Sequence, residues 1–239
     1  MQPTQKNKIR LLPYGMSDFA RIRRENRYYV DKTMFIPKLE EFSYQMFLRP
    51  RRFGKSLMLN MLAAYYDVAM KDRFDELFGG LYIGDNPTEE RNKYLILKFN
   101  FSGIDPDETK VQASFDTYVK SEIVAFTKKY SEYLSEDTSE VIKNCKNSND
   151  AFSTLKIAVS MSNMRIYVII DEYDNFANTM LADSETNYKN LTHGDGFFRL
   201  FFNNLKAATT DNDAAVSRIM ISGVTPLTLS DVTSGYNIG

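Results

Sequence analysis

Apolar residues along the chain alternate between short continuous runs and longer segments with helical spacing. The short runs are typical of strands buried on both faces, and the longer segments are typical of helices with one buried face. Strands are predicted at 44–49, 93–103, 164–176 and 217–227, and helices at 55–70, 107–134, 151–163 and 196–209. Residues 72–85 predict a short helix followed by a turn, and residues 136–150 a short helix that runs into a loop. Strands joined by long helical connections predict a mostly parallel sheet with helices on both faces.

Four further segments complete this pattern. The aromatic and β-branched residues at 27–33 predict a short strand, followed by Asp31 as a helix cap. Pro37 predicts that the next helix begins or kinks there. Residues 177–196 are rich in Asn, Thr and Gly and are expected to form a surface loop, and residues 229–239 are expected to leave the core.

Composition narrows the class of protein. A chain of 239 residues with 43% hydrophobic and 26% charged residues is long enough for one large globular domain. A net charge of −1 gives no global attraction to nucleic acid or anionic lipid, so any basic site must be local. One cysteine and one histidine argue against a disulfide framework and a zinc site. Because no apolar run reaches the length of a signal-peptide core or a membrane span, we expect a reduced, cytoplasmic protein.

The chain is expected to divide after residue 43. Residues 1–43, the N-terminal lead-in, are polar and basic and are predicted to pack on a core formed by residues 44–239. Acidic residues near these basic positions favour a solvated face over a contact with a phosphate backbone. Several aromatic residues are interpreted as core or adenine-pocket packing rather than as a platform for nucleic-acid bases. They are Tyr28, Tyr29, Phe197, Phe198, Phe201 and Phe202.

The sequence FLRPRRFGKSLMLNML, residues 47–62, places Gly54-Lys55-Ser56 between an apolar strand and an apolar helix. In a phosphate-binding loop, backbone N–H groups converge on the phosphates, the lysine adds positive charge and the serine holds Mg²⁺. The glycine expected five residues before Gly54 is Arg49, followed by Pro50, and an exposed basic turn is the alternative interpretation. The residues expected to contact the nucleotide are Arg51, Arg52, Phe53, Gly54, Lys55, Ser56 and Leu57.

The predicted strand at 164–176 carries two consecutive acids, Asp171 and Glu172. Ligands of open α/β sheets bind beyond the carboxyl ends of strands, so these acids are expected to face the phosphate loop. Asp171 can then hold Mg²⁺ together with Ser56, and Glu172 can orient and deprotonate an attacking water. A solvated turn explains two acids in isolation, but their combination with the loop favours a nucleotide site. Asp174 is interpreted as a cap of the following segment.

The last predicted strand ends in polar residues, in the sequence ISGVTPL. In a nucleoside-triphosphatase sheet, the strand beside the acidic one presents a polar residue near the γ-phosphate. Thr225 is the first candidate for that residue and Ser222 the second. A strand that ends in a proline turn is the alternative interpretation.

Four segments together resemble the AAA-ATPase-like family of prokaryotic proteins: YYVDKT, FLRPRRFGKS, VIIDEYD and SGVTPLTLSDVTSGYNIG. In that family an arginine replaces the first glycine of the loop. The resemblance covers residues 11–239 and implies a three-layer α/β P-loop NTPase core of the additional-strand type. It implies ATP and Mg²⁺ as ligands, with Lys55, Ser56, Asp171 and Glu172 in the roles above. Family members usually continue into a helical lid and a C-terminal nuclease-like domain, which we expect this chain to lack because it ends at Gly239.

These observations lead to the hypothesis of an ATPase that binds ATP with Mg²⁺, hydrolyses it slowly and drives or gates a partner domain. Glu172, Lys55 and Thr225 are the expected catalytic residues, and oligomerisation is expected to supply an arginine in trans. Two alternatives stay open. One is a nucleotide-dependent switch without turnover, and the other is a nucleic-acid-binding module whose RPRRFGK segment contacts phosphates of DNA or RNA.

Overall fold

The structure is a computed structural model that describes residues 10–210 and 214–226. Its sheet contains four parallel strands in the order β1-β4-β3-β2. They are β1 (Tyr44–Leu48), β2 (Tyr94–Asn100), β3 (Arg165–Asp171) and β4 (Val216–Gly223). All four predicted strands of the core are therefore confirmed. Among the described residues, the last strand, β4, lies between β1 and β3, which is the arrangement expected of an additional-strand sheet.

The strand register brings the carboxyl ends of all four strands to one edge of the sheet. Leu48 pairs with Gly223, Ile170 pairs with Ile221, and Asp171 pairs with Asn100. The loop that follows β1 and the acids that end β3 are thus separated only by the end of β4.

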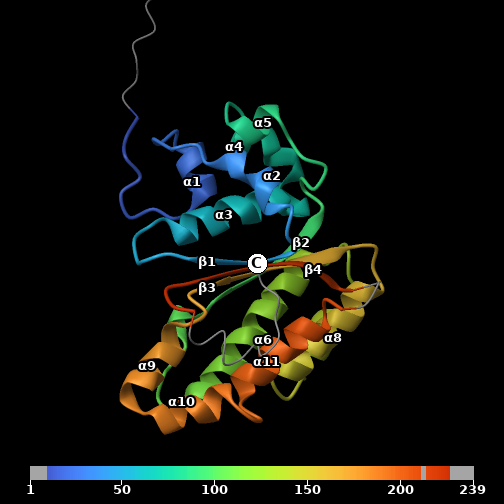
Figure 1. The fold of residues 1–239 in the computed structure, drawn as a ribbon. Helices are drawn as coiled ribbons and strands as arrows, with labels where there is room; N and C mark the ends of the chain where they lie inside the picture. Colours follow the sequence, from blue (N-terminus) through green and yellow to red (C-terminus); the bar gives the residue numbers. More distant parts are fainter. Residues whose placement is uncertain (1–9, 211–213, 227–239) are drawn as a thin grey trace, which may run out of the picture.

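Helices cover both faces of the sheet and give a three-layer α/β fold (Figure 1). One layer contains α1 (Phe19–Arg24), α2 (Ile36–Leu39), α3 (Lys55–Tyr66), α4 (Phe74–Phe78) and α5 (Tyr82–Asp85), with the 3₁₀ helices η1 (Thr33–Phe35) and η2 (Val68–Arg73). The other contains α6 (Val111–Lys129), α8 (Ser148–Ser160), α9 (Asn175–Asp183), α10 (Glu185–Thr192) and α11 (Phe197–Ala207). The 3₁₀ helix η3 (Phe101–Gly103) follows β2, and α7 (Thr138–Lys143) contacts α6 and α8.

Each face of the sheet packs on its own apolar cluster, because successive strand side chains point to opposite faces. Val168 and Ile170 belong to the cluster that includes the buried residues of α6, α8 and α11. Tyr167 and Ile169 belong to the cluster that includes α1, α3 and α4. Burial on both faces explains why β3 reads as a continuous apolar run.

Two predictions about irregular segments are wrong. Residues 27–32 form no strand, although Asp31 does accept the Thr33 backbone N–H at the start of η1. Residues 177–196 were expected to be a loop but contain most of α9 and all of α10. Their buried apolar residues, among them Met180, Tyr188 and Leu191, recur at helical spacing between the polar ones. The predicted course of residues 229–239 and the expected absence of a lid concern a segment outside the described residues.

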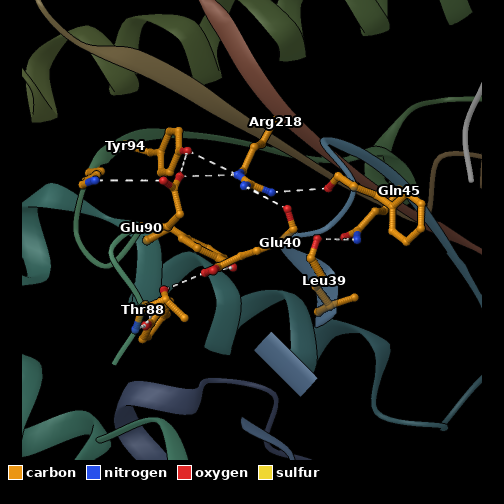
Figure 2. Close-up of polar contacts among 11 residues, drawn as sticks. Leu39, Glu40, Gln45, Thr88, Glu90, Tyr94 and Arg218 are labelled. Atoms are coloured by element: carbon orange, nitrogen blue, oxygen red, sulfur yellow. Dashed lines mark hydrogen bonds and ion pairs between the residues drawn. The ribbon is translucent and has the colours of Figure 1, made fainter. Parts of the chain in front are cut away.

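A polar network holds the end of the lead-in on the amino-terminal edge of the sheet (Figure 2). Arg218 of β4 donates to the carbonyl oxygens of Glu40 and Phe42, both at 3.3 Å, and to the Tyr94 hydroxyl at 3.2 Å. The Tyr94 hydroxyl in turn donates to Glu90, whose carboxylate lies 3.7 Å from the Arg218 guanidinium. Arg218 of β4 thereby forms hydrogen bonds both to the segment that precedes β1 and to β2.

We predict that Arg218→Ala lowers the free energy of unfolding by about 1–3 kcal/mol, because it leaves carbonyl and carboxylate acceptors without their donor. Urea unfolding measures this change. The matched control is Arg73→Ala, which removes only an exposed pair with Glu76 and should change stability little. Equal effects of the two substitutions would contradict the structural role assigned to Arg218.

Candidate functional site

The turn between β1 and α3, residues 49–54, forms the candidate phosphate loop. Gly54 ends it with a left-handed backbone (φ 76°) directly before the first residue of α3. Arg52 is also left-handed (φ 68°), and the Arg49 N–H donates to the Gly223 carbonyl at 3.2 Å. The loop therefore turns sharply at the edge of the sheet, and α3 begins directly after it. The free backbone N–H groups at a helix N-terminus are what an anion-binding turn requires.

Lys55 lies beneath this loop. Its side chain donates from Nζ to the carbonyl oxygens of Arg49 at 2.9 Å and Pro50 at 3.1 Å. Only 7% of the residue is exposed, so the ammonium group is held against the inside of the turn rather than in solvent. A cation in this position places a positive charge at the centre of the loop, and both hydrogen-bond partners found for it among the described residues are neutral carbonyl groups.

Asp171 connects three elements at the carboxyl edge of the sheet. Its carboxylate accepts hydrogen bonds from the Ser56 hydroxyl of α3 at 2.6 Å and from the Ser222 hydroxyl of β4 at 2.5 Å. The Glu172 N–H donates to the same carboxylate at 3.0 Å. The residue is 1% exposed, and hydrogen bonds to a buried carboxylate are strong because the acceptor is charged. The predicted meeting of the loop serine with the acidic strand is therefore present.

Glu172 follows Asp171 in a left-handed conformation (φ 51°). For a residue with a side chain this backbone is uncommon and costs on the order of 1–3 kcal/mol, which the surrounding contacts must offset. The conformation turns the chain from β3 into α9, and the Asn175 amide donates to the Glu172 carboxylate at 3.2 Å. Glu172 is partly exposed while Asp171 is buried, so the two acids occupy different environments.

The two polar candidates from the end of β4 lie in different places. Ser222 is fully buried and bonded to Asp171, whereas the Thr225 hydroxyl lies 3.5 Å from the Asn178 side-chain oxygen. The structure thus joins the second candidate, not the first, to the acidic strand. Asp174 is the N-cap residue of α9, as expected, but its carboxylate makes no capping hydrogen bond to that helix. The carboxylate accepts the backbone N–H groups of Val224 and Thr225 instead, at 3.0 and 2.8 Å. Asp174 therefore holds the expected N-cap position of α9 but caps it without a side-chain hydrogen bond.

The remaining residues of the basic turn are open to solvent. Arg51, Arg52 and Phe53 are exposed, and Leu57 is half-buried one turn into α3. The Arg49 guanidinium lies 5.1 Å from the centre of the Phe47 ring, within the range of a cation–π contact. The loop therefore surrounds the buried Lys55 with exposed cationic side chains.

Lys98 is a residue of this region that the sequence analysis missed. It lies on β2 and donates from Nζ to the Asn60 side chain, one helical turn after Ser56 on α3. Burial lowers the pKa of Lys98, and the negative charge of Asp171 acts in the opposite direction. A lysine inside an otherwise apolar strand, YLILKFN, is the signal in the sequence that points to it.

The oxygen atoms around Asp171 fit a magnesium ion better than a transition metal. Mg²⁺ is usually held by one or two carboxylates together with water and substrate phosphates rather than by an all-protein cage. Ser56 and Asp171 supply a hydroxyl and a carboxylate within hydrogen-bonding distance of each other. In residues 10–210 and 214–226, no three His, Cys, Asp or Glu side chains are grouped as they would be in a protein-only metal centre.

The fold and the loop define a P-loop-like α/β protein, and comparison with known proteins gives the family. The chain belongs to the family described as Predicted AAA-ATPase, whose model matches residues 13–233. It is also 29% identical over 230 residues to an uncharacterized protein in the vnfD 5′ region of Azotobacter chroococcum mcd 1. That alignment covers 95% of this chain and 39% of the relative, so the chain spans about two-fifths of the relative's length. No solved structure matches the chain.

The helices give no indication of a membrane span. Among the described residues, none forms a helix with both the length and the apolar character needed to cross a bilayer.

We predict that Gly54→Ala lowers the free energy of unfolding by about 1 kcal/mol, since a Cβ at this left-handed φ is strained although no atom lies within 4 Å of it. Chemical denaturation measures the change. Gly103→Ala is the matched control, because that position is equally open and is not left-handed. A loss of stability in Gly103→Ala as large as in Gly54→Ala would contradict the conformational explanation.

Proposed function

We propose that this chain binds ATP together with Mg²⁺ at the candidate phosphate loop and hydrolyses it slowly. The observation that carries the proposal is the Asp171 carboxylate, which joins the Ser56 hydroxyl at the start of α3 to the end of β3. A phosphate-binding turn and a carboxylate at one sheet edge are what nucleoside-triphosphate chemistry requires, because catalysis there rests on positioning and charge. Membership of a predicted ATPase family supports the same reaction.

The residues divide into those that hold the phosphates and those that act on water. The Gly54 turn and the N-terminus of α3 would direct backbone N–H groups at the β- and γ-phosphates, since Gly54 directly precedes α3. Lys55 would exchange its two carbonyl contacts for phosphate oxygens, since a triphosphate is a stronger partner for an ammonium group than a neutral carbonyl. The exposed cations Arg51 and Arg52 would lower the cost of gathering negative charge on the loop.

Ser56 and Asp171 would hold the magnesium ion, which neutralises charge on the phosphates when it is bound. Glu172 would accept a proton from the attacking water, a role that its partial exposure beside the buried Asp171 permits. Ser222 would keep the Asp171 carboxylate oriented through its hydroxyl. Thr225 is proposed to act near the γ-phosphate after movement of the β4 end, because its hydroxyl lies beside Asn178 here.

We further propose that hydrolysis drives or gates a partner domain of a longer protein. The relative from Azotobacter is much longer than the region it shares with this chain, so such proteins have room for further domains. A nuclease-like domain and a second copy of the chain that supplies an arginine in trans are the proposed partners.

We predict that Lys55→Ala weakens Mg·ATP binding about 10- to 100-fold, because the variant loses a charged donor to the phosphates. Isothermal titration calorimetry measures the affinity. The control is Lys71→Ala, which removes an exposed lysine of η2 away from the loop and should leave the affinity unchanged. Binding that is equally tight in the native chain and in Lys55→Ala would exclude this site.

We predict that Glu172→Gln lowers ATP turnover about 10²- to 10⁴-fold while Mg·ATP still binds, because the amide cannot accept the proton of the attacking water. Release of inorganic phosphate measures turnover, and Glu136→Gln, an exposed acid elsewhere, is the control. A native chain that binds ATP but shows no turnover dependent on Glu172 would be a nucleotide switch rather than an ATPase.

A further inference from the structure

Residues 171–174 at the end of β3 are bonded to the β4 end, residues 222–225, by more than the serine that reaches the acidic strand. The Tyr173 N–H donates to the Ser222 carbonyl at 3.2 Å, and the Tyr173 hydroxyl donates to the Thr225 carbonyl. Tyr173 is fully buried, so these two bonds are formed away from solvent. One tyrosine thus holds the β4 end at two points.

Asp174 adds two hydrogen bonds to the same segment. Its Oδ2 atom accepts the backbone N–H groups of Val224 at 3.0 Å and Thr225 at 2.8 Å, and the Asn178 amide at 3.1 Å. The residue is 2% exposed, and hydrogen bonds to a buried carboxylate are strong. An aspartate at an N-cap usually accepts N–H groups of its own helix. This carboxylate instead binds residues that lie 50 and 51 positions further along the chain.

Gly223 allows the two residues to approach the β4 end closely. A Cβ atom at this position would lie 2.3 Å from Cε1 of the Tyr173 ring and 2.7 Å from Oδ1 of Asp174, distances that no side chain tolerates. The Gly223 carbonyl accepts the Arg49 N–H, where the candidate phosphate loop begins. The glycine therefore contacts the loop on one side and Tyr173 and Asp174 on the other.

The β4 end joins the two parts of the proposed site. The phosphates are assigned to the loop after β1 and the attacking water to Glu172 after β3, and β4 lies between these two strands. A shift of the β4 end would change the separation of the loop from Glu172, and the rate of a reaction is very sensitive to such misplacement. We propose, on the basis of the proposed function, that Asp174 is a positioning residue for hydrolysis, which together with Tyr173 holds the β4 end and thereby the loop relative to Glu172.

The same contacts limit how Thr225 moves. Its backbone N–H is bonded to Asp174 and its carbonyl to Tyr173, whereas its hydroxyl makes only a long contact of 3.5 Å with Asn178. The movement that brings this hydroxyl to the γ-phosphate therefore pivots on the bonds to Asp174 and Tyr173, while the residues before Thr225 stay in place.

The test measures turnover by release of inorganic phosphate and the affinity for Mg·ATP by calorimetry. Asp174→Ala removes the acceptor of the two backbone N–H groups, and kcat falls about 100-fold. The affinity for Mg·ATP changes less than about threefold, because the phosphate loop and Lys55 are unaltered. Asp174→Asn keeps a side chain of the same size with one oxygen acceptor, so its kcat stays within about fivefold of the native value.

Tyr173→Phe tests the second residue that holds the β4 end. It removes the hydroxyl that donates to the Thr225 carbonyl and keeps the ring beside Gly223, and kcat falls about tenfold at nearly native affinity. Because it deletes a single atom, this variant decides the question should Asp174→Ala not fold. Asp183→Ala is the matched control: it removes an exposed aspartate at the last residue of α9 and leaves both quantities unchanged.

Native turnover in Asp174→Ala and Tyr173→Phe overturns the positioning role and leaves the proposed function standing. A loss of Mg·ATP affinity as large as the loss of kcat also overturns it, because a general structural defect then explains both. So does an equal loss of kcat in Asp174→Asn and Asp174→Ala, since the asparagine retains an acceptor. A native chain that shows no ATP turnover overturns the proposed hydrolysis itself, and the role of Asp174 with it.

Discussion

The carboxylate of Asp171 is the group on which the geometry of the sheet edge depends. It is buried, and a buried charge is costly unless several donors satisfy it. The donors come from three places: Ser56 lies in the first turn of α3, Ser222 lies next to the last residue of β4, and the N–H of Glu172 directly follows β3. One interaction thus fixes the helix after the loop, the acidic strand and the strand between them relative to one another.

Strand order makes this interaction available. Because β4 lies between β1 and β3, its end is next to both the candidate phosphate loop and Asp171. Side chains alternate along a strand, so Ser222 shares the α3 face with Met220, Ile169 and Asp171. Thr225 lies beyond the end of β4, where this alternation no longer determines its direction. That difference explains why the structure bonds Ser222, and not Thr225, to the acidic strand.

The sequence predicts well those features that local pattern and burial determine. The four core strands follow from apolar runs, and the meeting of Ser56 with Asp171 follows from the rule that parallel strands end at a common edge. Residues 27–32 show the limit of this reasoning, because strand-forming residues such as the exposed Tyr28 need a neighbouring strand to pair with. The prediction of a loop at 177–196 rested on composition. Polar residues outnumber apolar ones there, but the few apolar residues form the buried faces of α9 and α10. The hydrogen bonds of Asp174 and the site of Lys98 depend on tertiary contacts between distant segments, which no local pattern contains.

The proposed role of Asp171 is to hold magnesium beside the nucleotide at the loop. The most direct measurement is the affinity for ATP by calorimetry with and without Mg²⁺, in the native chain and in Asp171→Asn, which keeps the size of the side chain but removes its charge. We expect Mg²⁺ to tighten ATP binding in the native chain and this gain in affinity to be lost in Asp171→Asn. An equal gain from Mg²⁺ in both proteins would contradict it.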